Sequence, residues 1–393
     1  MIILHISGKP LSIFDACNLP ERRYGQRNFQ SESLMFDSVS LLYLGVLAAS
    51  SVIGIIYFIR PYASKFGLID DPDERKSHKG QIPLLGGPII AFVYFTGLFF
   101  VFPELETVGL AILPLGLVLT VGIWDDIKDI YPSIRLAIET IAAIMMVSIY
   151  QLSIGNIELI FGPLQGMGAP WLYQALTVFS IVLVINAFNM LDGIDGLCAT
   201  LAVLALQHTA LAINILDGSL PDRIAFTSIY LSGCLAGFLA FNLQNSSKRK
   251  IFLGDSGAMF LGLVVSVLTI VSFGQSGTGM IVSTGNYPAI ALWVLAIPLA
   301  DILTTSITRI LSGKNPMAPD QTHIHHRLID AGLSKLQALT ALVFAAIVYF
   351  WIGFFVTINF GNTASLIVFG LAILSILRLP ATSVYLLALA KRA

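Results

Sequence analysis

Charged residues are scarce in this sequence, and their scarcity decides the class of protein. The 393 residues include 22 lysines and arginines and 23 aspartates and glutamates, 11% of the chain, against about 25% in ordinary soluble proteins. Hydrophobic residues make up 56%, and the mean hydropathy is +0.83. A soluble domain of this length does not hide so much apolar surface, so the composition predicts an all-α polytopic membrane protein. At about 20 residues per span, about eleven spans is the upper bound.

Other absences exclude further classes. The three cysteines, Cys17, Cys198 and Cys234, form no C-x-x-C pair, which argues against a disulfide framework or a zinc site. The formal net charge of −1 gives no electrostatic reason to expect a nucleic-acid partner. The phosphate-binding pattern G-x-x-x-x-G-K-[ST] is missing from the sequence, so a phosphorylated substrate would have to be held by a metal ion and side chains.

Eleven apolar segments approach the length that a helix needs to cross a bilayer. Two of them, 107–123 and 134–150, are short, and the first contains Pro114. The predicted segments are 39–59, 84–102, 107–123, 134–150, 171–188, 196–215, 224–242, 256–273, 288–311, 338–358 and 364–388.

The basic residues predict the orientation of these segments. Sixteen of the 22 lie in the loops after odd-numbered segments or at the C-terminus, whereas the loops on the other side carry only Arg223. Because cytoplasmic loops are enriched in lysine and arginine, we expect the first segment to run from outside to inside. The C-terminus is then cytoplasmic.

Residues 1–38 are expected to form an N-terminal tail, and residues 39–393 the membrane-embedded domain. The tail lacks a long apolar core, so it is not a signal peptide. Either the start codon lies upstream of the true initiator, Met35, or the tail is a disordered extension. On the outer side, the loop 151–170 alternates apolar and polar residues between glycine and proline turns, which is typical of a small hairpin.

Polar clusters gather on the predicted cytoplasmic side. The loop 60–83 includes Asp70, His78 and Lys79, a mixed acidic and basic set that suits a phosphate group and a metal ion. A solvated loop between helices is the plain alternative.

A second cluster, in GIWDDIKD, ends the third segment. Asp125 and Asp126 are adjacent carboxylates, which repel each other and are often stabilised by a cation. Asp129 follows one helical turn later and is placed to share their face.

A third cluster, in NAFNMLDGIDGL, is more specific. Asn186, Asn189, Asp192 and Asp195 recur every third position, which places them on one slowly rotating helix face. Such a set is costly at a membrane surface without a ligand, and hard oxygen donors suit Mg²⁺ or Mn²⁺. A purely structural role is the alternative.

Asp255 opens the eighth segment in FLGDSGAMFLG, where it is either a ligand or an ordinary helix N-cap. Asp301 lies inside the ninth segment. An acid within the membrane marks a functional site by default, and a structural pairing with another helix is the alternative.

The last cluster is HIHHR, with His323, His325, His326 and Arg327. Histidine and arginine together are good partners for diphosphate oxygens. Zinc is a competing interpretation, but tetrahedral zinc sites use cysteine or more widely spaced histidines. With the preceding four clusters, this one points to an active site at the cytoplasmic surface of the membrane.

From about residue 39 to its end, the chain resembles the polyprenyl-phosphate N-acetylhexosamine-1-phosphate transferases. The resemblance rests on GIWDDIKD, NAFNMLDGIDGL, FLGDSGAMFLG and HIHHR, in that order. It is greatest with the bacterial type that makes undecaprenyl-diphospho-N-acetylglucosamine. Relatives that transfer phospho-N-acetylmuramoyl-pentapeptide have a run of adjacent histidines, which Ile324 interrupts here.

This resemblance implies two substrates, UDP-N-acetylglucosamine and undecaprenyl phosphate, with UMP as the second product, in the bacterial inner membrane. It implies that Asn189 and Asp255 bind Mg²⁺, with Mn²⁺ as a substitute. The implied catalytic residues are Asp125, Asp126, Asp192 and Asp255. The substrate-binding residues that the resemblance implies are Asp195, His323, His325, His326 and Arg327. The polar clusters themselves add Asp70, His78, Lys79, Asp129 and Asn186 as predicted substrate-binding residues.

Several alternatives stay open at this point. They are another UDP-N-acetylhexosamine or the muramoyl-pentapeptide substrate, a homodimer, and an ion-coupled secondary transporter. A transporter site usually lies near the bilayer midplane, whereas nearly all acids here lie near one surface. Because a phosphate monoester has its second pKa near about 6, the lipid phosphate has little proton to lose at neutral pH. We therefore expect Asp125 and Asp126 to position groups rather than act as a general base.

Overall fold

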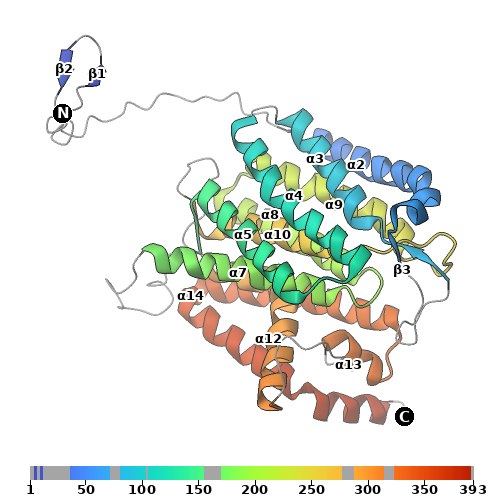
Figure 1. The fold of residues 1–393 in the computed structure, drawn as a ribbon. Coiled ribbons are helices and arrows are strands. Elements are labelled where there is room, and N and C mark those ends of the chain that lie inside the picture. Colours follow the sequence, from blue (N-terminus) through green and yellow to red (C-terminus); the bar gives the residue numbers. More distant parts are fainter. Residues whose placement is uncertain are drawn as a thin grey trace. The chain divides into compact units, whose positions relative to one another are not determined.

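A computed structural model of the chain describes residues 4–6, 9–11, 36–70, 80–102, 105–154, 170–276, 287–313 and 323–390 (Figure 1). The chain divides into two compact units, Met1–Phe36 and Asp37–Ala393. In the first unit, β1 (Leu4–Ile6) pairs antiparallel with β2 (Lys9–Leu11). The second unit contains all the predicted polar clusters.

Helices dominate the second unit, which confirms the predicted all-α class. They are α2 (Ser38–Ile59), the 3-10 helix η1 (Arg60–Phe66), α3 (Gly86–Val101), α4 (Leu105–Lys128), α5 (Pro132–Tyr150), α7 (Pro170–Leu191), α8 (Leu197–Asp217), α9 (Asp222–Asn242), α10 (Gly254–Phe273), α11 (Ala289–Val294), α12 (Ala296–Leu311), α13 (Ile324–Asp330) and α14 (Lys335–Ala390). Two short antiparallel pairs join loops: β3 (Ile69–Asp70) with β4 (Ile82–Pro83), and β5 (Leu152–Ser153) with β6 (Gln275–Ser276).

Every predicted apolar segment overlaps one of these helices. Within the described residues, eight helices are long and apolar enough to cross a membrane. The segment 288–311 is divided at Leu295 into α11 and α12. The last two segments form α14, in which Gly361 has a non-helical backbone with φ of 83°. The protein is therefore a polytopic membrane protein, and the exact number of eleven spans stays a prediction.

The outer hairpin predicted within 151–170 lies largely outside the described residues. Its first residues, Leu152 and Ser153, pair with Ser276 and Gln275. They therefore connect the end of α5 to the end of α10, through contacts across 124 and 122 residues that no local pattern indicates.

Helix α10 forms the core of the second unit. All but two of its 20 residues are buried, and it packs against α3, α4, α7 and α8 (Figure 1). Glycines allow the closest approach: a Cβ on Gly122 of α4 would lie 2.3 Å from the Cα of Ser256. This backbone contact brings the carboxyl end of α4 against the amino end of α10, where two of the predicted acidic clusters lie.

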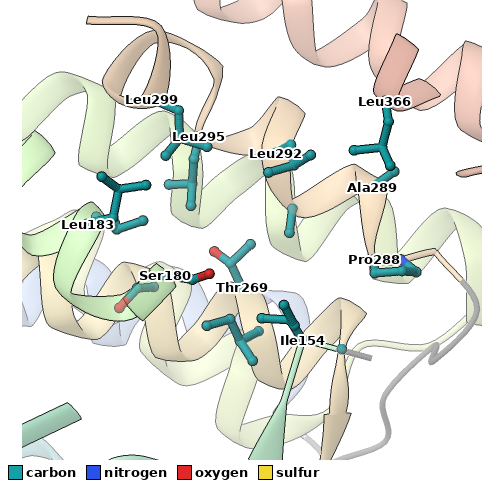
Figure 2. A pocket seen from close by; sticks show the side chains of 15 residues that line it. Ile154, Ser180, Leu183, Thr269, Pro288, Ala289, Leu292, Leu295, Leu299 and Leu366 are labelled. Carbon is teal, nitrogen blue, oxygen red and sulfur yellow. The ribbon is translucent and has the colours of Figure 1, made fainter. Parts of the chain in front are cut away.

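An apolar cavity of about 150 Å³ lies near the opposite end of α10 (Figure 2). Its lining comes from α7, α10, α11, α12 and α14, and includes Leu183, Thr269, Leu292, Leu295 and Leu366. Thr269 is 14 positions after Asp255, which is about 21 Å along a helix. The cavity and the acidic clusters thus lie at different depths of the bundle.

Candidate active site

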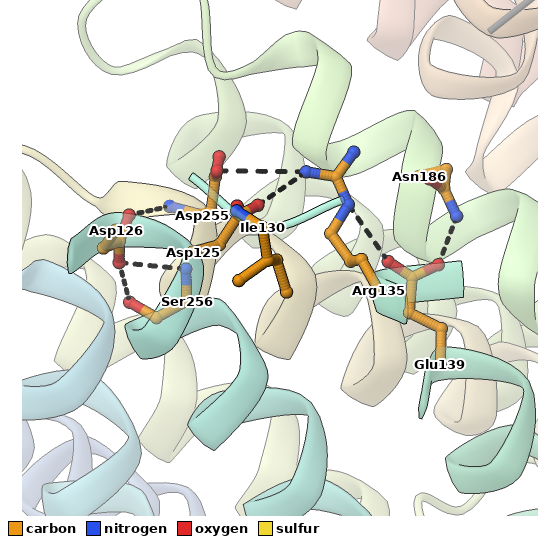
Figure 3. A network of polar contacts seen from close by, with 8 residues as sticks. All are labelled: Asp125, Asp126, Ile130, Arg135, Glu139, Asn186, Asp255 and Ser256. Carbon is orange, nitrogen blue, oxygen red and sulfur yellow. Dashed lines mark hydrogen bonds and ion pairs between the residues drawn. The ribbon is translucent and has the colours of Figure 1, made fainter. Parts of the chain in front are cut away.

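Asp126 caps the amino end of α10 from a different helix (Figure 3). Its Oδ1 accepts a hydrogen bond from the backbone N–H of Asp255 at 2.7 Å. Its Oδ2 accepts from the N–H and the Oγ–H of Ser256, at 3.2 and 2.7 Å. A helix begins with unpaired N–H groups that favour negative charge. The expectation that Asp255 itself could be the N-cap is therefore wrong, because the capping carboxylate comes from α4.

Asp125 is buried beside Asp126 and has different partners. Its Oδ1 accepts from the backbone N–H of Ile130 at 2.9 Å, and its Oδ2 accepts from the Nη1 of Arg135 at 2.8 Å. The same Nη1 lies 3.9 Å from Oδ2 of Asp255. One nitrogen of Arg135 therefore faces two of the predicted catalytic acids, as Figure 3 shows.

Arg135 and Glu139, which sequence reasoning missed, complete this network. Glu139, one turn after Arg135 on α5, is fully buried, and its Oε1 lies 3.7 Å from the Nε of Arg135. Asn186 of α7 donates its amide to Glu139 at 2.5 Å and to the carbonyl of Val182 at 2.9 Å. Asn186 was predicted to bind substrate, and in the structure the nitrogen of its amide group holds a buried acid. A charged pair four residues apart in an apolar helix was the available signal.

The turn between α7 and α8 carries Asp192 and Asp195. Lys250 donates to Oδ2 of Asp195 at 2.6 Å, and Asn242 accepts from the N–H of Gly196 at 2.6 Å. Asp192 remains accessible to solvent. The surrounding protein displaces part of the water around this carboxyl group, and this effect, with smaller contributions from the nearby charges of Asp126 and Asp195, raises the pKa of Asp192 to about 7. The turn therefore presents acids that a cation would stabilise.

Asn189 lies at the end of α7, close to this turn. Within the part of the chain that the structure describes, its buried Nδ2 has no hydrogen-bond partner. A buried amide without a partner is costly. Asp255, in contrast, keeps 39% of its side-chain surface exposed. These two predicted metal ligands are thus less engaged with the protein than Asp125 and Asp126 are.

The histidine segment is anchored to α12. Asp301, fully buried, accepts from Nδ1 of His323 at 2.8 Å and from the N–H of Ile324 at 2.6 Å. His325 is buried, and burial lowers its pKa to about 4, with a further contribution from His326. A Cβ on Gly193 would lie 2.1 Å from Nε2 of His325. The segment therefore rests on the turn that carries Asp192.

The remaining predicted residues are less centrally placed. Arg327 donates to the carbonyl of Ile376 at 3.1 Å, and removal from water lowers its pKa. Asp70 lies in β3. Asp129 follows the last residue of α4, exposed and with φ of 26°, so it does not continue the helix face of Asp125. His78 and Lys79 lie outside the described residues.

Comparisons with known proteins match most of the chain to one family. The sequence model of glycosyl transferase family 4 matches residues 107–273. An undecaprenyl-phosphate alpha-N-acetylglucosaminyl 1-phosphate transferase of Salmonella typhi is 33% identical over 303 residues, 76% of this chain and 79% of its own. The chain belongs to glycosyl transferase family 4. Proteins of the same name from Escherichia coli K12 and Yersinia pestis are 32% and 31% identical, over 74% and 82% of this chain and 77% and 84% of their own.

Membership of glycosyl transferase family 4 confirms the resemblance that the motifs predicted, and it makes the protein a membrane-embedded transferase. The segment that matches the family contains Asp125, Asp192 and Asp255. The histidine segment lies beyond that match, and the contact of His325 with Gly193 joins it to the family's segment.

Proposed function

We propose that the protein transfers N-acetylglucosamine 1-phosphate from UDP-N-acetylglucosamine to undecaprenyl phosphate and releases UMP. The phosphate of the lipid attacks the sugar-bearing phosphorus of the nucleotide sugar, and the bond to UMP breaks. The product is a lipid-linked sugar diphosphate, the first membrane intermediate of a cell-surface glycan. We place the reaction at the cytoplasmic face of the bacterial inner membrane, because the basic loops lie on that side of the predicted spans.

One observation carries this proposal: acids from α4, the α7–α8 turn and α10 meet at one end of the helix bundle. Asp126 contacts the first turn of α10, one nitrogen of Arg135 faces both Asp125 and Asp255, and the charge of Asp126 acts on Asp192. The relatives, at 31–33% identity over most of the chain, are named for this transfer.

The site suits a magnesium ion. Within the described residues, no group of three or more histidine, cysteine or acidic side chains is placed to hold a metal. Mg²⁺ does not need such a group, because it keeps several waters and binds one or two carboxylates together with substrate phosphates. Asn189 and Asp255 would provide protein oxygens, with Mn²⁺ as a substitute. When bound, the ion would neutralise negative charge on the diphosphate and on the departing UMP.

The protein's own residues fit a positioning role. Both oxygens of Asp125 and both oxygens of Asp126 accept hydrogen bonds from protein donors. Oxygens used in this way hold the end of α4 against α5 and α10, which favours positioning over proton abstraction. His323, His325, His326 and Arg327 supply the ring and guanidinium groups that suit diphosphate oxygens.

The apolar cavity of Figure 2 supports a lipid substrate. It lies about 21 Å along α10 from Asp255, and most of its lining residues are apolar, leucine and isoleucine being the most frequent. A hydrocarbon chain attached to a phosphate at the acidic site would find apolar surface there. A transporter has less support, because its ion-coupling acids would be expected near the midplane.

Release of UMP from separate nucleotide sugars tests the proposal. Purified protein is incubated with undecaprenyl phosphate, Mg²⁺ and one of UDP-N-acetylglucosamine, UDP-N-acetylgalactosamine or UDP-N-acetylmuramoyl-pentapeptide. We expect the fastest release from UDP-N-acetylglucosamine and none after chelation of the metal. Asp255→Asn is the matched control, since it removes one charge and keeps the shape of the side chain. No UMP from any of the three would refute the function, and a preference for the pentapeptide would refute the sugar.

A further inference from the structure

Asp301 is a fully buried acid on α12 whose two oxygens face the histidine segment. Oδ2 lies 2.8 Å from Nδ1 of His323, and Oδ1 accepts the N–H of Ile324 at 2.6 Å. A buried carboxylate is costly unless its oxygens are paired, and here the first residues of α13 and its flank provide both partners. The acid that stood out within the ninth segment therefore fixes the start of α13 on α12.

This contact also decides where the ring of His323 carries its proton. An ionised carboxylate only accepts hydrogen bonds, so Nδ1 of His323 must be the donor. The other nitrogen, Nε2, is then the one that can meet a ligand. A tenth of the side-chain surface of His323 is exposed, so the ring is held by the interior of the bundle without being enclosed by it.

The histidine segment is in turn held against the acidic turn. The rings of His323 and His325 are nearly parallel, with centroids 5.8 Å apart, and His325 lies directly over Gly193. A chain of contacts thus leads from Asp301 through His323 and His325 to the turn of Asp192.

From this geometry we propose that Asp301 is a positioning residue for the transfer. It acts through His323: the carboxylate accepts the Nδ1–H, so the ring that meets the diphosphate of the nucleotide sugar carries its second proton on Nε2 and donates it to a phosphate oxygen. The proposal rests on the proposed function. A doubly protonated ring donates from both nitrogens, and only a carboxylate at position 301 accepts the Nδ1–H. An amide there would present an N–H to Nδ1, and the charge-assisted contact to the diphosphate, about twice as strong as a neutral one, would be lost.

The informative variant is Asp301→Asn, which is nearly the same size. Its Oδ1 still accepts from Ile324, so the start of α13 keeps its anchor, while Nδ2 replaces the oxygen that faces His323. We expect kcat/KM for the nucleotide sugar to fall about 10- to 100-fold, the range for removing an outer partner that orients a histidine. The matched control is Thr305→Val on the same helix. The buried Oγ1 of Thr305 has no hydrogen-bond partner within the described residues, so we expect its activity to match the wild type.

A double-mutant cycle separates positioning from general support of the fold. If Asp301 acts through His323, Asp301→Asn changes kcat/KM by less than about twofold in a His323→Gln background, because the interaction is already absent. The same 10- to 100-fold loss in both backgrounds would overturn the proposal, as would an unchanged single variant.

Nitrogen-15 spectra of histidine-labelled protein provide a readout that does not depend on turnover. The His323→Gln variant identifies the signal of His323 among the six histidines. We expect Nδ1 to be protonated in the wild type and unprotonated in Asp301→Asn. A wild-type ring with a bare Nδ1 would overturn the positioning role. If no sugar phosphate is transferred at all, the proposed function fails, whereas the spectra still report whether Asp301 fixes the ring.

Discussion

Replacing Arg135 by glutamine should uncouple stability from activity in the network of Figure 3. Arg135 contacts Asp125 at 2.8 Å and lies 3.7 Å from Glu139 and 3.9 Å from Asp255. Removing one partner of a buried ion pair costs about 3–5 kcal/mol. Because a quarter of the Arg135 side chain is exposed, we expect the lower end, about 3 kcal/mol.

The double variant Arg135→Gln with Glu139→Gln removes the fully buried charge together with its partner. The double variant no longer leaves Glu139 buried without its partner, so we expect part of the lost stability to return. The rest stays lost, because Asp125 still lacks its 2.8 Å contact with Arg135. Activity should stay low, because Asp125 and Asp255 still face each other without the guanidinium. The thermal midpoint in detergent reports stability, and the rate of UMP release reports activity.

Arg223→Gln is the matched control, since Arg223 lies over the ring of Phe102 at the amino end of α9 and outside the proposed site. We expect its activity to be unchanged. The reasoning is refuted if Arg135→Gln keeps the wild-type midpoint, or if the double variant recovers activity along with stability.

Three further predictions follow from single residues. Gly254 has φ of 76°, and a Cβ there would lie 2.6 Å from Oδ2 of Asp126, so Gly254→Ala should lower both the thermal midpoint and activity. Its control is Gly218→Ala, at φ of 70° with open space around it, which should lower the midpoint alone. An equal loss of activity in the two variants would contradict the role of Asp126 as the cap of α10. The pKa of Asp192 is raised to about 7 from an ordinary value of 3.8, so its ionisation opposes folding above pH 7 and not below pH 4. Asp192→Asn should therefore raise the thermal midpoint of the metal-free protein at pH 8 and leave it unchanged at pH 4. A rise at pH 4 with none at pH 8 would contradict the raised pKa. In Asp125→Asn, the loss of activity should be constant from pH 6 to pH 9; recovery at high pH, where the lipid phosphate is fully ionised, would favour a general base.

The fold was predictable from the sequence because the membrane imposes a simple rule on it. A backbone in lipid must satisfy its hydrogen bonds within each segment, so long apolar runs become helices, as α2 and α9 do. Runs with a break were less predictable. Leu295 divides α11 from α12. Pro298, three residues later, removes one helical N–H donor, but it does not by itself fix where the break falls.

The acidic site was predictable in its members but not in its pairings. Asp125, Asp192 and Asp255 stood out as acids beside apolar runs, and the structure brings their helices together. That Asp126 caps α10 depends on a contact across 129 residues, and that Asp301 meets His323 depends on one across 22. No periodicity encodes either contact.

Arg135 and Glu139 show why part of the network was missed. Arg135 was counted among the basic residues that set topology, and Glu139 was one acid in an apolar helix. Their role appears only once Asn186 of α7 and Asp125 of α4 are beside them. A charged pair one turn apart inside a predicted span deserves to be treated as a candidate site from the start.

The central claim is that this protein breaks the diphosphate bond of the nucleotide sugar and transfers the sugar together with its phosphate. The direct measurement uses UDP-N-acetylglucosamine labelled with radioactive phosphorus at the sugar-bearing phosphate, together with undecaprenyl phosphate and Mg²⁺. The account predicts that the label enters the lipid fraction and that unlabelled UMP is released in equal amount. Label that remains in the aqueous phase as UDP, with sugar alone on the lipid, would contradict it.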